Sequence, residues 1–133
     1  MKKVLAMIFV LAMLVSSVAM AETIVVMPKL VGIPYFNASE EGVKAAGEEL
    51  GIEAKYVGPT EGDAAQQVQM IEDLLVQGID ALAIAPNDPD SVSPALQKCS
   101  ADGVLVLDWD TTANGDDVVY SVHQIDEIGR AHV

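Results

Sequence analysis

Short apolar runs alternate with longer amphipathic segments along most of the chain. Runs such as Ile-Val-Val-Met, Ala-Leu-Ala-Ile-Ala and Val-Leu-Val-Leu contain no polar positions. Such runs are typical of strands whose two faces are both covered by helices, because neither face then meets water. The pattern predicts five strands, at Thr23–Met27, Ala54–Val57, Ala81–Ala85, Val104–Leu107 and Val118–Val122.

Three helices are predicted between the strands. Each has apolar residues at the spacing of one helical face, as in Val68, Ile71 and Leu74, and each is followed by a glycine or a glycine-containing turn. An aspartate, Asp63, stands where it can cap the second helix. The helices are expected at Asn37–Leu50, from the cap Asp63 to the stop at Gly78, and from Ser91 or Ser93 to about Asp102.

Strands and helices that alternate with short loops predict an α/β fold with a doubly wound parallel sheet. In such sheets, ligands bind beyond the carboxyl ends of the strands, near the point where the strand order reverses. The informative residues are therefore those that directly follow each strand. They lie in 28–36, 58–62, 86–91, 108–115 and the segment after Val122.

The N-terminal segment predicts a secretory signal peptide at residues 1–21. Lys2 and Lys3 precede the apolar run Val4–Val15, and a small-residue site ends at Ala21. The run is shorter than the roughly 20 residues that a membrane span needs. No cysteine follows the cleavage site, so a lipid anchor is not expected. The protein is therefore predicted to be exported, most simply to a bacterial periplasm.

The origin of the C-terminal residues 127–133 is open to two interpretations. The stretch Glu127–Val133 can be encoded by a common sequencing-adapter read in one frame. The hypothesis is that this tail is not native; the alternative is an ordinary helix start with a histidine near the end. No functional role is expected for Arg130 or His132.

Charge and cysteine content narrow the classes of partner. Removal of residues 1–21 would leave 112 residues, one domain's worth, and would change the formal charge from −13 to −15. So acidic a surface argues against nucleic acid and anionic lipid as partners. Cys99 is the one cysteine in the sequence, so it is either buried or paired outside this chain, and its helical position favours burial.

Three stretches, in order along the chain, resemble a known family. "PKLVGIPYFNASEEGVKAAGEELG", "GPTEGDAAQQVQMIEDLLVQGIDALAIAPNDPDS" and "VLDWDT" are similar to the periplasmic sugar-binding proteins of ABC importers. Within that family, they are most similar to the branch that binds rhamnose and autoinducer-2. The resemblance implies two lobes that close on a ligand, with residues 22–126 as most of the N-terminal lobe.

Asp110 and Lys29 are the charged site candidates. A carboxylate offers about four lone-pair sites, so two neighbouring hydroxyls can donate to it side by side. The resemblance places the family's ligand-binding aspartate at Asp110, although Asp110 could instead cap a turn beside Thr111 and Asn114. It also places at Lys29 a lysine that reaches ligand oxygens, with a solvated surface lysine as the alternative.

The remaining site candidates come from the same resemblance or from their position at this edge. Tyr35 and Phe36 match an aromatic pair that could cover the C–H face of a sugar, Phe36 being the ring expected to stack, or one of them could pack in the core. Asn87 and Asp88 lie in a turn-rich loop at the same edge and could contact the ligand. Gln124 matches an amide that follows the fifth strand in relatives.

The predicted function is the solute-binding component of an ABC transporter for a rhamnose-type sugar or autoinducer-2. The expected partners are that ligand and an inner-membrane permease, with a monomer when full length. No catalytic set, metal-ligand cluster or cofactor motif is recognised, so no cofactor is expected. The alternatives are a chemosensory receptor module for autoinducer-2, an exported carbohydrate-active enzyme, or the effector domain of a repressor, against which the signal peptide argues.

Overall fold

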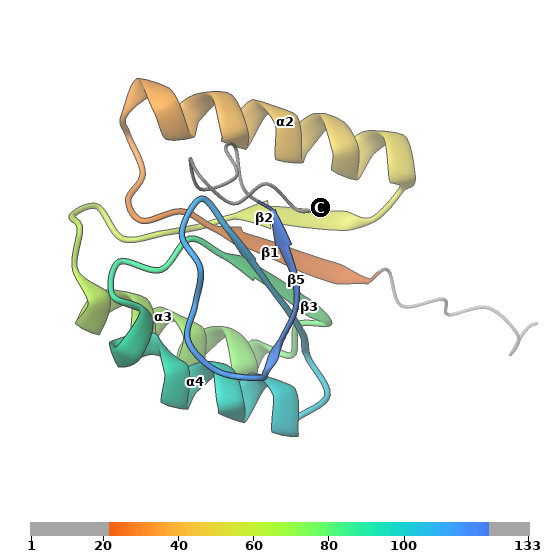
Figure 1. The fold of residues 1–133 in the computed structure, drawn as a ribbon. Coiled ribbons are helices and arrows are strands. Elements are labelled where there is room, and N and C mark those ends of the chain that lie inside the picture. The colour runs from red at the N-terminus through yellow and green to blue at the C-terminus, as the bar shows by residue number, and fades with distance from the viewer. Residues whose placement is uncertain (1–21, 123–133) are drawn as a thin grey trace, which may run out of the picture.

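The computed structural model describes residues 22–122, which form one parallel sheet with helices on both faces (Figure 1). The sheet has five strands in the order β2-β1-β3-β4-β5, and every neighbouring pair is parallel. The strand order reverses between β1 and β3, as in a doubly wound sheet. The predicted fold class is confirmed. The strands are β1 (Thr23–Met27), β2 (Glu53–Tyr56), β3 (Ala81–Ile84), β4 (Leu105–Trp109) and β5 (Val118–Val122).

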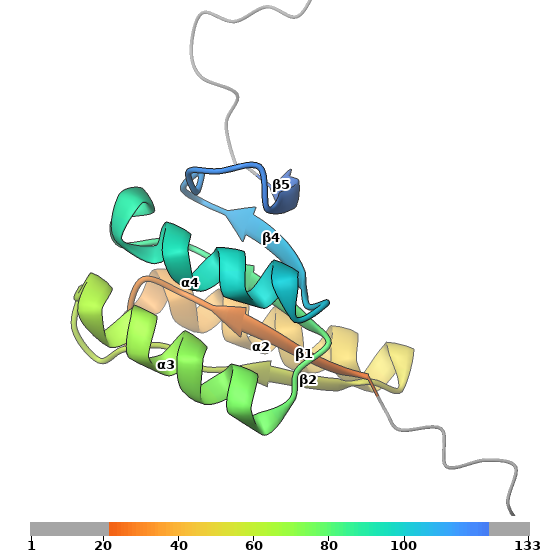
Figure 2. The same cartoon turned by 90° about the horizontal axis from the view of Figure 1, so that it is seen from below.

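The helices form two layers around the sheet. Helix α2 (Pro34–Leu50) covers one face, and α3 (Ala64–Gln77) and α4 (Pro89–Ala101) lie side by side on the other (Figures 1 and 2). The main core lies between the sheet and the α3–α4 layer. Its fully buried members include Val25, Met27, Ile71, Leu82 and Leu96. These residues come from the apolar strand runs and the apolar helix faces seen in the sequence.

Two helices begin earlier than predicted, and proline is the reason in both. Helix α2 begins at Pro34 instead of near Asn37, and α4 begins at Pro89 instead of at Ser91 or Ser93. Proline fits the first helical position because its φ is already helical and its missing N–H would have no partner there. The predicted starts were therefore wrong by two to four residues, and Tyr35 and Phe36 lie in the first turn of α2 instead of in a loop.

Strand β4 is displaced toward the C-terminus relative to the prediction. It covers Leu105–Trp109 instead of Val104–Leu107, so Asp108 and Trp109 belong to the strand. Their partners are Ser121 and Val122 of β5. This pairing is long-range, and the apolar run alone gave no sign of it. The other strand boundaries agree with the prediction to within one residue.

The predicted cap of the second helix is confirmed. The Asp63 carboxylate accepts hydrogen bonds from the backbone N–H groups of Ala65, at 2.8 Å, and Gln66, at 3.4 Å. These N–H groups have no partner inside the helix, so the cap satisfies donors that would otherwise depend on water. Gly78 ends the same helix in the left-handed conformation, also as predicted.

Asp63→Ala is expected to lower the free energy of unfolding by about 0.5–2 kcal/mol, the usual cost of losing an N-cap. Urea unfolding followed by circular dichroism measures it. Asp63→Asn is the matched control, since asparagine caps helices about as well as aspartate. Equal losses in the two variants would contradict the capping role and point to the negative charge instead.

Cys99 is buried in helix α4 and has no disulfide partner among residues 22–122. Burial raises the pKa of its thiol to about 11, so the thiol stays protonated near neutral pH. The predicted burial is confirmed, and Cys99 acts as a small apolar residue of the core.

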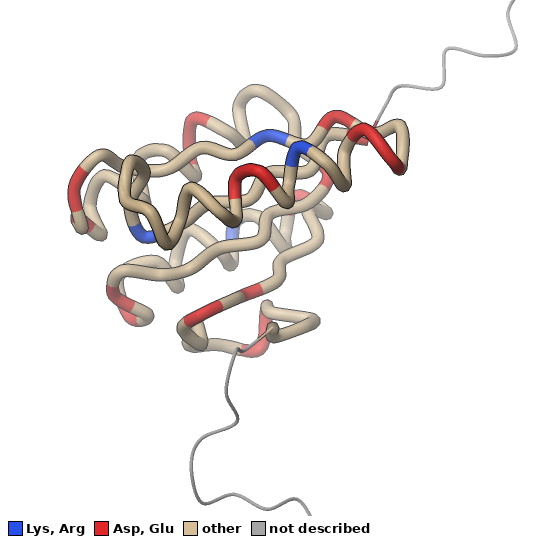
Figure 3. Tube along the Cα trace, turned by 90° about the horizontal axis from the view of Figure 1, so that it is seen from above, with Lys and Arg blue, Asp and Glu red and all other residues tan. Residues whose placement is uncertain are grey.

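Three predictions concern residues outside the described range: the signal peptide at 1–21, the site residue Gln124 and the tail at 127–133. Between residues 22 and 122, no helix combines the length and the apolar character needed to cross a membrane. Acidic positions are distributed around the whole described trace, with few basic ones between them (Figure 3).

Candidate functional site

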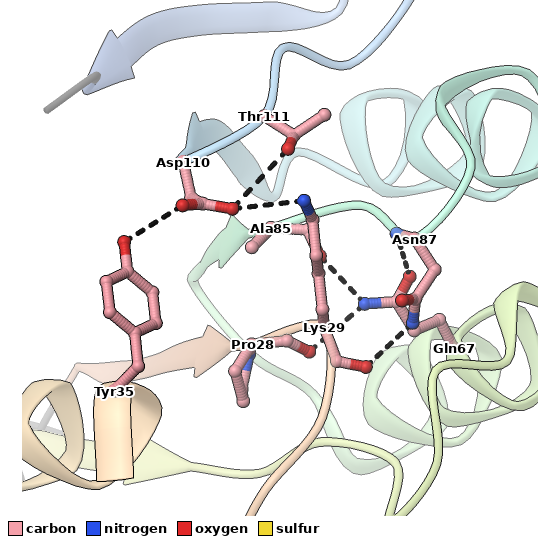
Figure 4. A network of polar contacts seen from close by, with 8 residues as sticks. All are labelled: Pro28, Lys29, Tyr35, Gln67, Ala85, Asn87, Asp110 and Thr111. Carbon is pink, nitrogen blue, oxygen red and sulfur yellow. Dashed lines mark hydrogen bonds and ion pairs between the residues drawn. The ribbon is translucent and has the colours of Figure 1, made fainter. Parts of the chain in front are cut away.

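The candidate site lies at the carboxyl edge of the sheet, beside the switch between β1 and β3. The loops after β1, β3 and β4 meet there and bring Lys29, Asn87 and Asp110 together with Tyr35 from the first turn of α2 (Figure 4). These four residues were all predicted from the sequence. The structure therefore assembles, at a single edge, side chains that are up to 81 positions apart.

Asp110 is the centre of this cluster. Lys29 Nζ lies 3.1 Å from Asp110 Oδ2, and the Tyr35 hydroxyl donates a hydrogen bond of 2.9 Å to Asp110 Oδ1 (Figure 4). The Thr111 hydroxyl makes a longer contact with Oδ2, at 3.4 Å. Both carboxylate oxygens thus already have partners, so a ligand that binds here must share or replace some of these contacts.

The backbone at Asp110 is unusual. Its φ is +64°, and it is the one residue other than glycine with a positive φ among residues 22–122. Asp and Asn adopt this left-handed conformation at lower cost than other residues with a Cβ. The Asp110 N–H donates to the carbonyl of Val122 at 3.1 Å, which ties the turn to the end of β5. The turn directs the carboxylate toward Lys29 and Tyr35.

The ionisation of Asp110 reflects its neighbours. Burial by itself would raise the pKa of this carboxyl, but the hydrogen bonds from Lys29 and Tyr35, the positive charge of Lys29 and the Thr111 contact outweigh it. The net result is a pKa below the ordinary value for aspartate. Asp110 is therefore ionised at neutral pH and remains a hydrogen-bond acceptor.

The aromatic pair divides into an exposed ring and a buried one. Tyr35 is 43% exposed, whereas Phe36 is 4% exposed. Phe36 makes edge contacts with Tyr35, with ring centroids 4.9 Å apart, and with Trp109, at 5.7 Å. Of the two alternatives, Phe36 thus takes the packing position, opposite to the expected order. A ligand contact by either ring remains a prediction.

Two further hydrogen bonds hold the backbone at Phe36 and the ring of Trp109. The Tyr56 hydroxyl donates to the carbonyl of Phe36 at 2.9 Å. Burial, with smaller contributions from Glu40 and Tyr35, raises the pKa of Tyr56 to about 12, so this donor keeps its proton. The indole N–H of Trp109 donates to the carbonyl of Ala83 at 3.3 Å.

Asn87 and Asp88 both have structural contacts within the lobe. The Asn87 amide donates to the carbonyl of Lys29 at 2.7 Å. Asp88 caps helix α4 by accepting from the Ser91 N–H at 2.7 Å. Hydrogen bonds from the Ser91 side chain and from this N–H hold the pKa of Asp88 below its ordinary value. Their expected contacts with a ligand stay predictions, as does that of Gln124.

Two buried polar residues near the site were missed in the sequence. Gln67 is fully buried, and Asp108 is 1% exposed with its Oδ2 accepting from the Ala113 N–H at 2.8 Å. Asp108 Oδ1 is buried and has no hydrogen-bond partner among residues 22–122. Both had the same signal: a polar residue at an apolar position, Gln67 on the stripe of Ile71 and Leu74, and Asp108 at the end of an apolar strand run.

The cluster contains groups that suit the recognition of a polar ligand. It offers a carboxylate, an ammonium group and a phenol, which can exchange hydrogen bonds with hydroxyl and carbonyl oxygens. No group of three or more histidine, cysteine, aspartate or glutamate residues that could hold a metal ion occurs in 22–122.

Comparisons with known proteins find a matching family and similar sequences. The sequence model of a family described as "Periplasmic binding protein domain" matches residues 24–131. The ribose import binding protein RbsB of Bacillus subtilis is 32% identical over 80 residues, which cover 60% of this chain and 26% of the relative. The chain therefore spans about a quarter of that relative's length.

Solved structures show the same fold. LsrB from Clostridium saccharobutylicum in complex with AI-2 superposes with a TM-score of 0.74 at 29% identity, covering 77% of this chain and 31% of that one. A solute-binding protein from Clostridium phytofermentas with bound L-rhamnose gives 0.70 at 32% identity, covering 80% and 33%.

Proposed function

Because the chain belongs to the family of type I periplasmic binding proteins, we propose that it captures a small hydroxyl-rich ligand for an ABC importer. The observation that carries the proposal is the joining of Lys29, Tyr35 and Asp110 at the carboxyl edge, beside the strand switch where α/β sheets bind ligands. A charged acceptor next to a charged donor suits a molecule whose hydroxyl groups both donate and accept.

The proposed ligand is a rhamnose-type sugar or autoinducer-2. Structures of relatives with AI-2 and with L-rhamnose support this choice. Ribose belongs among the candidates too, because RbsB of Bacillus subtilis is named a ribose import binding protein. The lobe offers few groups that discriminate among these molecules, since Asp110 and Lys29 can bond to hydroxyl oxygens of any of them.

The proposed organisation has two lobes. Residues 22–126 would form most of the first lobe, preceded by a signal peptide at 1–21 and followed here by a non-native tail at 127–133. The 26% coverage of the ribose-binding relative supports a further lobe in the complete protein. Such proteins hold the ligand between lobes that close about a hinge. The proposed partner is an inner-membrane permease, and the proposed location is the periplasm.

A thermal-shift panel on the complete two-lobe protein tests the function. Because a ligand that binds only the folded state raises its melting temperature, L-rhamnose, ribose or autoinducer-2 is expected to raise it in proportion to the logarithm of ligand concentration. Amino acids serve as the negative set. Intact mass of the exported protein should place its first residue at Glu22. No shift with any sugar, or turnover of one, would contradict the proposal.

A further inference from the structure

Gln67 is a buried amide whose hydrogen bonds all leave its own helix. Its side chain is fully buried on the inner face of α3. Nε2 donates to the carbonyl of Pro28 at 3.1 Å and to the carbonyl of Ala85 at 2.9 Å, and Oε1 accepts from the Asn87 N–H at 2.8 Å (Figure 4). Both amide hydrogens are thus used, on two different strand ends.

These contacts join the two loops at the strand switch. Pro28 follows β1, and Ala85 and Asn87 follow β3. Asn87 adds a fourth bond, because its side chain donates to the carbonyl of Lys29 at 2.7 Å. The main chain at Lys29 is therefore held on both sides: by Gln67 through the preceding carbonyl of Pro28, and by Asn87 through its own carbonyl.

The position of this main chain matters because Lys29 must reach across a strand. Lys29 follows β1, Asp110 follows β4, and β3 lies between them. Neighbouring strands are about 4.8 Å apart, so β1 and β4 are separated by about 10 Å. The Lys29 side chain spans this gap to bring Nζ to 3.1 Å from Asp110 Oδ2. A flexible lysine whose base moved outward would lose that contact.

We propose that Gln67, together with Asn87, is a positioning residue of the site: its buried amide sets the place from which Lys29 reaches Asp110. The proposal rests on the proposed function only in taking the Lys29–Asp110 pair as part of a ligand site. Asn87 then acts through Lys29 within the lobe, in addition to any contact with a ligand.

The test is the titration of the Asp110 carboxyl, followed by ¹³C NMR in the full chain without ligand. Lys29→Met sets the reference, because it removes the positive charge that helps lower the Asp110 pKa. Gln67→Met keeps the side-chain volume but removes all three hydrogen bonds. It is expected to raise the Asp110 pKa toward the Lys29→Met value, and to add nothing further in the Lys29→Met background.

Two more variants keep the test decisive. Gln69→Met is the matched control, since Gln69 lies on the same helix with an exposed side chain that donates to Asp73, and it is expected to leave the titration unchanged. Asn87→Ala changes a half-buried loop residue, so it carries the test if Gln67→Met does not fold. It is expected to shift the Asp110 pKa in the same direction.

The outcomes separate this inference from the proposed function. An Asp110 titration that stays at the wild-type value in folded Gln67→Met or Asn87→Ala protein would overturn the positioning role, whatever the protein binds. A shift in these variants, with Gln69→Met unchanged, supports it even if the two-lobe protein binds no sugar. In a protein that does bind sugar, the variants should lose affinity in the order of their pKa shifts.

Discussion

Asp110→Ala is expected to abolish measurable sugar binding by the two-lobe protein while the lobe stays folded. The substitution removes the acceptor for ligand hydroxyls and leaves the Lys29 ammonium and the Tyr35 hydroxyl without the partner they have now. Each hydrogen bond lost in this way costs roughly 1–3 kcal/mol, and more when a charge is left unpaired. Two such losses amount to about 2–6 kcal/mol, which corresponds to a drop in affinity of at least about thirtyfold. Isothermal titration calorimetry measures it.

Two controls separate the ligand contact from the shape of the turn. Asp110 has a φ of +64°, which alanine tolerates less well than aspartate or asparagine. Asp110→Asn keeps a residue suited to this conformation, but it removes the charge and replaces one acceptor oxygen by an NH2 donor, so it should also lose most affinity. Asp116→Ala removes an exposed carboxylate from the same loop and should bind like wild type. Unchanged affinity in Asp110→Asn would refute the role of the carboxylate.

Leu82→Ala is expected to cause the largest loss of stability, about 2–5 kcal/mol in the free energy of unfolding. Leu82 is fully buried in the central strand β3, where it pairs with Val25 of β1 and Val106 of β4. Truncation leaves a cavity that the sheet cannot close, because both neighbouring strands are fixed by hydrogen bonds. Small domains have only about 5–15 kcal/mol in total, so this loss is a large share.

Leu105→Ala is the matched control for this substitution. Leu105 lies in the adjacent strand β4 and is 47% exposed, so the same change removes less buried surface. Since both replacements exchange leucine for alanine in a strand, the difference in strand propensity cancels. Chemical denaturation of both variants should show a clearly smaller loss for Leu105→Ala. Equal losses would mean that the core is not centred on β3.

The general plan of the lobe could be predicted from local sequence alone. A strand that is covered on both faces must be apolar throughout, and a helix over a sheet must have an apolar face. Buried positions can therefore be predicted from the pattern of apolar residues. Caps add the ends of helices, as at Asp63 and Gly78. The doubly wound order then follows from short connections between strands and helices.

Helix starts at proline were the systematic error. Pro34 and Pro89 were both assigned to loops, although both occupy the first position of a helix. Proline is compatible with either place. Asp88, directly before Pro89, caps α4, whereas Tyr56 on the distant strand β2 holds the first turn of α2 through Phe36. This error placed the two aromatic rings in a loop, whereas they lie in the first turn of α2.

For the candidate site too, the sequence predicted some features and the fold determined the others. The position after apolar strands, together with the family resemblance, nominated Lys29, Tyr35, Asn87 and Asp110, since parallel strands bring their carboxyl ends to one edge. The partners of these residues were not readable, because Tyr35 meets Asp110 across 75 positions and Asn87 meets Lys29 across 58. The sequence also did not reveal that Phe36, the ring expected to stack on the ligand, is buried while Tyr35 is exposed.

Local order along the chain thus specified which elements form and which edge collects polar side chains, because both depend on short-range burial patterns. Only the folded arrangement specified the distances between those side chains, since each distance depends on how strands far apart in sequence pair and how buried groups such as Gln67 satisfy their hydrogen bonds. Hydrogen bonds form only between groups about 3 Å apart, so those that join distant parts of the chain exist only once the sheet is assembled.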